Sequence, residues 1–252
     1  MNNQFIIVID FDETIGFFSD LYKFWYYVKI YLNTELPYKY LYKLLDKYPL
    51  FFRPGILDIF KYIKNKKKNN VCNKVILYTN NKGSAPWITK ILNYINFKID
   101  YNLFDYIIQN IDTNKSYSTL NKLLVKNNNN INLHICFIDD NYHPEMINKN
   151  ILYINIKPYI YNTNFSKLCK YFYNNNRNLF TNIVHTEYHF TNYILSNINN
   201  YNNSYNTIDK KYNLIISKKI KNNIKLFLNN NKKTYKTSKN YKNKTKKNYL
   251  KY

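Results

Sequence analysis

The sequence predicts an α/β fold in which helices flank a mostly parallel central sheet, and three observations support this prediction. Short apolar runs rich in β-branched residues recur along residues 1–175. Stretches with apolar side chains at helical spacing lie between these runs. The runs are apolar throughout rather than alternating, which is typical of strands that are buried on both faces. Strands that alternate with helices form a parallel sheet with helices against its faces.

The expected elements follow in order along the chain. Strands are expected over residues 5–9, 74–78, 106–108, 134–138 and 151–156. Helices are expected over residues 21–32, 38–45, 56–63, from Ser84 or Pro86 to 95, 118–125 and 165–172. The first two helices fall in the segment 17–52, which is therefore a small helical insert after the first strand. The spacing after the second strand leaves no room for a large cap domain there.

The regular pattern weakens beyond residue 174. We expect one α/β domain over residues 1–175, a weakly helical extension over 176–228 and a tail over 229–252. Within the extension, residues 215–228 have apolar side chains at helical spacing. The tail consists largely of Lys, Asn and Tyr, a low-complexity composition that predicts disorder.

Composition and charge exclude several classes of protein. With 3 Gly and 6 Pro the chain is not collagen-like, and an apolar content of 45% excludes a fully disordered chain. The formal net charge is +23. Residues 210–252 contain 15 Lys and no Asp or Glu, so they carry +15 and leave +8 for the rest. The chain is thus mildly basic with a strongly basic C-terminal tail.

The basic tail over residues 210–252 has three interpretations. Asn, Lys, Ile and Tyr share A/T-rich codons, so the lysines can be a by-product of an A/T-rich genome, such as that of a large DNA virus or a protist. The tail can instead bind nucleic acid non-specifically, with tyrosines that stack on bases. The lysine run over residues 244–247 also resembles a nuclear-targeting signal.

Other features indicate an intracellular protein, either cytoplasmic or nuclear. The cysteines at 72, 136 and 169 are too far apart for a metal-binding or redox motif, and sparse thiols are typical of a reducing compartment. The N-terminus has no secretory signal, because its apolar run ends at Asp10. No stretch reaches 18 apolar residues without a charge, so no membrane partner is expected.

Acidic residues follow two of the expected strands. Asp10 and Asp12 come directly after the first strand, and Asp139 and Asp140 end the fourth. In parallel sheets, ligands bind beyond the carboxyl ends of the strands. One of two neighbouring carboxylates can act as a nucleophile while the other transfers protons. A phosphate held against several negative charges requires a divalent cation, and Mg²⁺ prefers oxygen ligands.

Further polar residues are placed to bind a phosphate. Thr79 and Asn80 follow the second strand, where a hydroxyl and an amide can donate hydrogen bonds to phosphate oxygens. Thr14 completes the pattern that begins at Asp10. Lys115 precedes a helix, and its charge can neutralise a phosphate and an attacking carboxylate.

The order of these motifs resembles that of the haloacid dehalogenase (HAD) superfamily over residues 1–175. The resemblance implies a Rossmannoid fold and a phosphoaspartyl enzyme. Asp10 would attack phosphorus, and Asp12 would protonate the leaving group and then activate water. Asp10, the Asp12 backbone carbonyl, Asp139 and Asp140 would hold Mg²⁺. Thr79 and Lys115, with Thr14 and Asn80 nearby, would bind the phosphoryl group.

Within the superfamily the chain looks most similar to the FCP/SCP type, the NLI-interacting-factor-like phosphatases. Residues 10–14 read Asp-Phe-Asp-Glu-Thr, close to that family's Asp-Leu-Asp-Glu-Thr, and residues 53–55 read Arg-Pro-Gly. The stretch 115–120 resembles the family's Lys-Asp-Leu segment. This resemblance implies a protein serine/threonine phosphatase with phosphorylated peptides as substrates. The sequence departs from the family at 78–81 and in the helical insert, which leaves the substrate open.

Two alternatives and several minor residues remain. The same chemistry would serve a polynucleotide 3′-end phosphatase that recruits nucleic acid through its basic tail. The chain could also be a non-catalytic binding module on a HAD fold. Arg53 is interpreted as a loop anchor, His134 as a structural residue, and the aromatic residues around Trp25 as core. His143 follows the second acidic pair, and we expect it to lie outside the site.

Overall fold

The computed structural model describes residues 2–81, 85–109, 114–125, 131–181, 186–199 and 209–229. In these residues a five-stranded sheet has the order β3-β2-β1-β4-β5, and all neighbouring strands are parallel. The strands are β1 (Asn2–Ile9), β2 (Lys74–Thr79), β3 (Tyr106–Gln109), β4 (Ile131–Asp139) and β5 (Ile151–Asn155). The predicted α/β fold with a parallel sheet is confirmed, and it is Rossmann-like.

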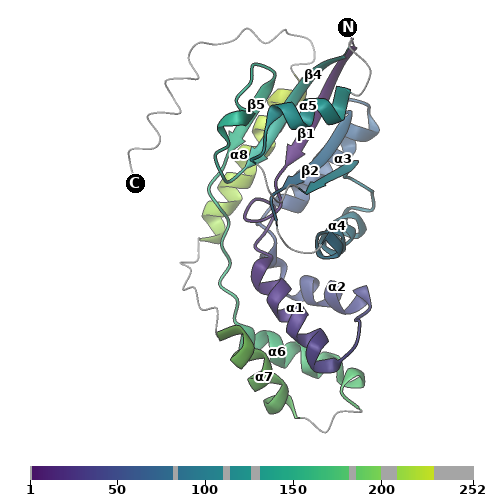
Figure 1. The fold of residues 1–252 in the computed structure, drawn as a ribbon, viewed down its shortest axis with the longest axis vertical. Helices are drawn as coiled ribbons and strands as arrows, with labels where there is room; N and C mark the ends of the chain where they lie inside the picture. Colours follow the sequence, from purple (N-terminus) through teal and green to yellow (C-terminus); the bar gives the residue numbers. More distant parts are fainter. Residues whose placement is uncertain are drawn as a thin grey trace.

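Six of the helices lie where apolar periodicity predicts them, within five residues at each end (Figure 1). The described helices are α1 (Ser19–Leu32), α2 (Tyr38–Lys47), α3 (Ile56–Lys68), α4 (Ala85–Ile99), α5 (Tyr117–Val125), α6 (Phe165–Asn175), α7 (Glu187–Asn199) and α8 (Lys210–Asn229). Helix α8 begins five residues before the predicted stretch 215–228, and α7 was expected only as part of a weakly helical extension. Short 3₁₀ turns cover Pro49–Phe51, Pro144–Met146 and Arg177–Leu179. Between β2 and β3 the described residues contain only α4, so the expected absence of a large cap domain there holds for them.

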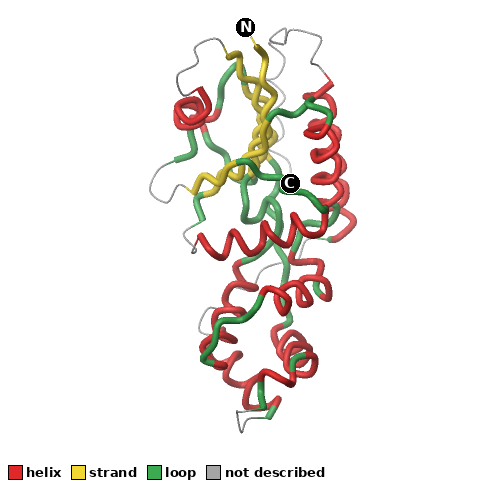
Figure 2. Tube along the Cα trace, turned by 90° about the vertical axis from the view of Figure 1, so that its right-hand side faces the viewer, coloured by secondary structure: helices red, strands yellow, loops and turns green. Residues whose placement is uncertain are grey.

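Helices cover both faces of the sheet (Figure 2). Ile7 and Ile9 of β1 point into a large apolar cluster that also contains side chains of α3, α4 and α8. Ile6 and Val8 point to the opposite face, where a smaller cluster contains Leu120 of α5. Because β1 is buried on both faces, its sequence is apolar throughout, which is the pattern that predicts a central parallel strand.

A second group of helices lies beyond the carboxyl edge of the sheet (Figure 1). We call α1, α2, α6 and α7 the helical lobe. Phe24 of α1 and Phe172 of α6 meet edge to face at 5.7 Å, and Phe190 of α7 lies 5.2 Å from Tyr31 of α1. Tyr48, just after α2, donates a hydrogen bond to the Lys167 carbonyl at 3.0 Å. The predicted insert over 17–52 therefore packs with helices from the far end of the chain.

The region after residue 175 divides between these two groups. Helix α7 packs in the helical lobe, whereas α8 packs against the sheet through Ile220, Ile224 and Phe227. Residues 210–229, which the sequence assigned to the basic tail, thus include a packed helix. Disorder is predicted over residues 229–252, but Asn229 instead ends α8, and residues 230–252 lie outside the described residues. Among the described helices, none combines the length and the apolar content that crossing a membrane requires.

Candidate active site

The strand order places a topological switch point beside β1. The chain runs from β1 outward through β2 to β3, and then returns to the other side of β1 with β4. Asp10 follows β1 and Asp139 ends β4, so the two acidic pairs lie next to each other at the carboxyl edge. Ligand sites in open α/β sheets form at such switch points. The position of the predicted site residues is therefore a consequence of topology.

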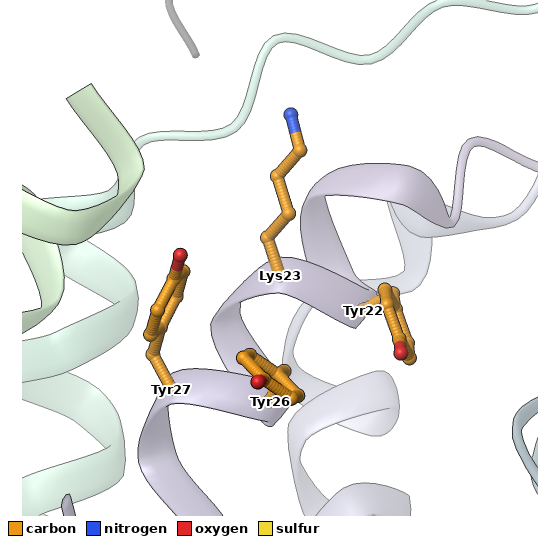
Figure 3. Close-up of a pocket in the computed structure, with 4 residues that line it drawn as sticks. All are labelled: Tyr22, Lys23, Tyr26 and Tyr27. Atoms are coloured by element: carbon orange, nitrogen blue, oxygen red, sulfur yellow. The ribbon is translucent and has the colours of Figure 1, made fainter. Parts of the chain in front are cut away.

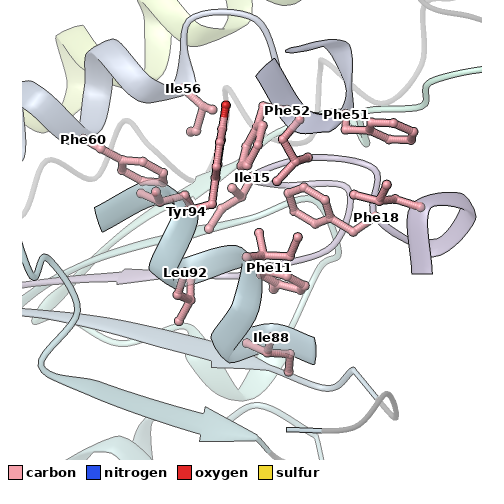
Figure 4. Close-up of a cluster of buried hydrophobic side chains, with 14 of the residues drawn as sticks. Phe11, Ile15, Phe18, Phe51, Phe52, Ile56, Phe60, Ile88, Leu92 and Tyr94 are labelled. Carbon is pink, nitrogen blue, oxygen red and sulfur yellow. The ribbon is translucent and has the colours of Figure 1, made fainter. Parts of the chain in front are cut away.

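The loop after β1 is fixed by apolar side chains that alternate with the polar ones. Phe11 and Ile15 are fully buried in the large apolar cluster, where Phe11 stacks on Phe18 at 4.8 Å (Figure 4). Gly16 lies so close to Phe51 that a Cβ there would clash with the Phe51 carbonyl oxygen. These contacts hold the backbone of the loop while Asp10 and Asp12 face the carboxyl edge.

Lys115 joins the two acidic pairs. Its Nζ donates hydrogen bonds to Asp10 Oδ1 at 2.5 Å and to Asp139 Oδ2 at 2.6 Å, and all three side chains are buried. The next residue, Ser116, accepts a hydrogen bond from the Thr119 N–H at 3.2 Å, as a helix N-cap does. The start of α5 thereby fixes the position of the Lys115 backbone.

Burial and charge act in opposite directions on the pKa values of this group. Burial raises the pKa of Asp10 well above its usual value, the Lys115 charge opposes that rise, and the Asp139 charge adds to it. Burial lowers the pKa of Lys115, but the charges of Asp10 and Asp139 outweigh burial and leave that pKa raised. Lys115 therefore remains a cation that favours the ionised form of Asp10.

Thr14 is engaged with Asp140. Its hydroxyl donates to Asp140 Oδ1 at 2.8 Å and accepts from the Asp140 N–H at 3.1 Å. Burial raises the pKa of Asp140, and the Thr14 hydrogen bond opposes that rise. The structure therefore places Thr14, predicted to bind phosphate, in a role that orients an acidic side chain.

Asp12 is held by a residue that the sequence did not single out. The Asn81 side-chain amide donates to Asp12 Oδ2, and the Asn81 N–H donates to the Thr79 hydroxyl at 3.0 Å. Burial raises the pKa of Asp12 to about 6, although the Asn81 hydrogen bond opposes this effect. Thr79 is buried and keeps its own hydroxyl proton to donate. The predicted residue Asn80 lies half-buried beside it.

Three carboxylates could hold a metal ion. One ligand oxygen each from Asp10, Asp139 and Asp140 lies within 4.8 Å of the others. Hard oxygen donors of this kind suit Mg²⁺. The Asp12 carboxylate is outside this set, and its predicted contribution is a backbone carbonyl, which accepts from the Thr14 N–H at 2.5 Å. The donor set fits the predicted cofactor, with three of the four predicted residues contributing side chains.

Two histidines and one arginine complete the site's surroundings. Arg53 is buried and donates to the backbone carbonyls of Glu13 and Thr14, which confirms its interpretation as a loop anchor. His134 stacks on a β1 ring and is structural, as expected. His143 was expected outside the site, but its Nε2 lies 3.3 Å from Asp139 Oδ2. Its place in the short loop that follows Asp139 and Asp140 is the signal that could have found it.

The helical lobe carries a shallow pocket of about 190 Å³ on α1 (Figure 3). It is lined by Tyr22, Lys23, Tyr26 and Tyr27. Tyr22 packs edge to face on Trp87 of α4 at 5.4 Å, and Tyr26 is 47% exposed. Trp25 is buried, as its interpretation as core requires. The interpretation as core is wrong for Tyr26, which is exposed, while Tyr22 and Tyr27 are half-buried.

No protein-family model, curated protein or solved structure matches this chain. The assignment of function consequently depends on the residues at the carboxyl edge of the sheet and on their geometry.

Proposed function

We propose that this protein is a Mg²⁺-dependent phosphomonoester hydrolase of the HAD type that acts through a phosphoaspartyl intermediate on Asp10. The observation that carries the proposal is the cluster of Asp10, Asp139 and Asp140 around Lys115 at the switch point of the sheet. A mere strand-end cap does not require a buried lysine between two acidic pairs. Buried, mutually coupled ionisable groups are characteristic of active sites.

In the first step a carboxylate oxygen of Asp10 attacks phosphorus, and the bond from phosphorus to the leaving oxygen breaks. Asp12 gives its proton to that oxygen. Its pKa of about 6 leaves it about half protonated near pH 6, which suits a general acid in weakly acidic solution. Lys115 and the Thr79 hydroxyl supply a charge and a hydrogen-bond donor for the phosphoryl oxygens.

In the second step Asp12, now ionised, takes a proton from water as the water oxygen attacks phosphorus. The bond between phosphorus and Asp10 breaks, and inorganic phosphate leaves. Asn81 keeps the Asp12 carboxylate oriented through both steps, because it donates to Asp12 Oδ2. The same residue thereby serves as acid and then as base.

Asp10, Asp139, Asp140 and the Asp12 carbonyl are the residues that would hold Mg²⁺. When bound, the ion neutralises negative charge on the phosphoryl oxygens. Thr14 orients Asp140 for this role through its paired hydrogen bonds. The Nε2 of His143 lies 3.3 Å from the Oδ2 of Asp139.

The favoured substrate is a phosphoserine or phosphothreonine in a protein, as in the FCP/SCP type. Support comes from the segment between β2 and β3, whose described residues form one helix and no cap domain. No domain is inserted among those residues, which favours large substrates over small metabolites, and the helical lobe beyond the carboxyl edge would determine which of them can approach (Figure 1).

A polynucleotide 3′-phosphate is the second candidate substrate. It is supported by the exposed lysines of α8, at positions 210, 211, 218, 219 and 225. Residues 230–252 add nine Lys and no Asp or Glu, so their removal takes away most of the basic charge of 210–252 and leaves α8 in place, which distinguishes the two substrates. Hydrolysis of a phosphopeptide should survive the truncation, whereas hydrolysis of an oligonucleotide 3′-phosphate should fall, most strongly at low salt.

The proposal is tested by Mg²⁺-dependent hydrolysis of p-nitrophenyl phosphate at pH 5.5–7. Asp10→Asn should lower kcat by about 10³-fold or more, because the nucleophile is lost. Asp58→Asn is the matched control, since Asp58 is exposed on α3. Equal rates for wild type and Asp10→Asn would overturn the proposal and favour a binding module.

A further inference from the structure

Arg53 connects two loops at the carboxyl edge of the sheet. Its Nε donates to the Thr14 carbonyl at 2.8 Å, and its Nη2 donates to the carbonyls of Glu13 at 2.5 Å and Lys157 at 2.8 Å. Glu13 and Thr14 follow β1, and Lys157 follows β5. The Tyr159 N–H also donates to the Glu13 carbonyl at 2.7 Å. The backbone that directly follows Asp12 is therefore tied to the loop after β5 by one buried side chain.

The fourth partner of Arg53 is a side chain from α8. Arg53 Nη1 donates to Asn213 Oδ1 at 3.1 Å, and Asn213 is fully buried. The Asn213 amide group donates in turn to the Asp209 carbonyl at 3.2 Å. That second bond fixes the orientation of the amide, so that its oxygen faces the guanidinium.

The first turns of α8 also hold the backbone that carries Arg53. Ser217 Oγ donates to the Pro54 carbonyl at 2.6 Å. Gly55 has φ of +85°, and a Cβ there would lie 3.1 Å from the Ser217 Cβ. Because glycine adopts this left-handed conformation without strain, the chain can turn tightly against α8. The far end of α8 is fixed separately, where Phe227 meets Phe5 of β1 at 5.6 Å.

The loop that Arg53 holds needs such support. Glu13 has φ of +55°, in the left-handed region that non-glycine residues rarely adopt. A residue in that conformation persists when its surroundings determine it. Burial lowers the pKa of Arg53 to about 10, so the guanidinium is still charged at neutral pH. A buried charged group that loses a hydrogen-bond acceptor is expected to move toward another one.

We propose that Asn213 is a positioning residue, which acts through Arg53 to hold the loop of Glu13 and Thr14 and hence Asp12. The inference rests on the proposed function for its effect on catalysis, but its effect on the loop is independent of that function. The first turns of α8 then support the site, although they follow the last strand by more than 50 residues, whereas the rest of α8 packs in the apolar cluster.

The test compares Asn213→Ala with Ile224→Ala, a buried control on the same helix that is remote from Arg53 in sequence and packs in the apolar cluster. Asn213→Ala should lower kcat for p-nitrophenyl phosphate by about tenfold and leave KM nearly unchanged, because the proton-transfer geometry at Asp12 is disturbed. Ile224→Ala should lower the midpoint of urea unfolding and leave kcat unchanged. Asn213→Asp retains the acceptor and should recover most of the lost kcat.

Hydrogen exchange supplies the readout that does not depend on activity. The peptide over residues 10–18 should exchange about tenfold faster in Asn213→Ala, and at the wild-type rate in Ile224→Ala. If the wild type proves inactive, the proposed function fails while this measurement still decides the role of Asn213. If Asn213→Ala does not fold, Asn213→Ser is measured in its place, with a smaller expected increase. Equal exchange of that peptide in the Asn213 and Ile224 variants would overturn the inference.

Discussion

The carboxyl edge of the sheet and the helical lobe differ in the side chains that they bury: charged groups at the edge and aromatic rings in the lobe. At the edge, a buried lysine lies between Asp10 and Asp139, and burial opposes the ionised forms of several groups. In the lobe, rings from three helices pack edge to face, as Phe190 and Tyr31 do at 5.2 Å. Burying charged groups at the carboxyl edge lowers the stability of the folded protein, whereas burying apolar rings in the lobe raises it. Substitutions should therefore separate chemistry from stability.

The largest combined effect on stability and activity is expected at Lys115. Lys115→Met leaves Asp10 and Asp139 buried without their cation, which should destabilise the metal-free protein by about 3–5 kcal/mol. Activity should fall by at least about 10²-fold, because the positive charge of Lys115 no longer stabilises the negative phosphoryl oxygens. Urea unfolding in EDTA and the rate of p-nitrophenyl phosphate hydrolysis measure the two effects. Lys122→Met, exposed on the same helix, is the control and should change neither. A fully active Lys115→Met variant would contradict the claim that substitutions at the site affect catalysis whereas those in the lobe affect only stability.

A similar loss of stability without loss of chemistry is expected in the lobe. Phe190 is fully buried, so Phe190→Ala should destabilise the protein by about 3 kcal/mol. At a temperature where the variant is folded, kcat should equal that of the wild type. Tyr188→Ala changes a ring that is 71% exposed on the same helix, and it should unfold at the wild-type midpoint. A tenfold loss of kcat in folded Phe190→Ala would show that lobe and site are coupled.

The pH dependence of stability sharpens the comparison. The folded state raises the pKa of Asp12 from 3.8 to about 6, so it binds this proton more tightly than the unfolded state does. The resulting stabilisation is present below pH 3.8 and is lost as pH rises through 6. In EDTA, Asp12→Asn should therefore gain stability over wild type between pH 4 and 7.5, by up to about 3 kcal/mol. The lobe variant Phe190→Ala should differ from wild type by a constant amount over that range. If the difference in unfolding free energy between Asp12→Asn and wild type did not change with pH, burial would not be raising the pKa of Asp12.

The smallest effect is expected at the surface of the lobe. Tyr26→Ser removes an exposed ring of the α1 pocket and should change the unfolding free energy by less than about 0.5 kcal/mol. Hydrolysis of p-nitrophenyl phosphate should be unchanged. A parallel assay with a phosphopeptide shows whether the pocket contributes to binding a larger substrate, as a rise in KM.

The strands and helices could be predicted because their apolar periods are strong. The continuous β-branched run at residues 5–9 is typical of a strand covered on both faces, and β1 is such a strand. Asp10, Asp139 and Lys115 could be found as well, because each follows a strand or precedes a helix. Strand ends are the positions where parallel sheets bind ligands.

What the sequence could not supply are the contacts between distant segments. Asn81 was passed over for its neighbour Asn80, since only the turn after β2 decides which amide reaches Asp12. Thr14 was expected to face a phosphate, but the register of β1 and β4 brings it to Asp140. The contact between Arg53 and Asn213 spans 160 residues, and no local pattern indicates it. For the same reason the helical lobe could be predicted only as separate helices.

The most direct test of the central claim is a pre-steady-state experiment on Asp12→Asn with Mg²⁺ and p-nitrophenyl phosphate. The p-nitrophenolate ion leaves without a proton, so transfer of the phosphoryl group to Asp10 should still occur, whereas hydrolysis of the intermediate should be slow. We predict a burst of about one p-nitrophenolate per protein, followed by slow turnover. Peptide mapping after acid quench should place the phosphoryl group on Asp10. Steady turnover without a burst, or a phosphoryl group on another residue, would contradict the account.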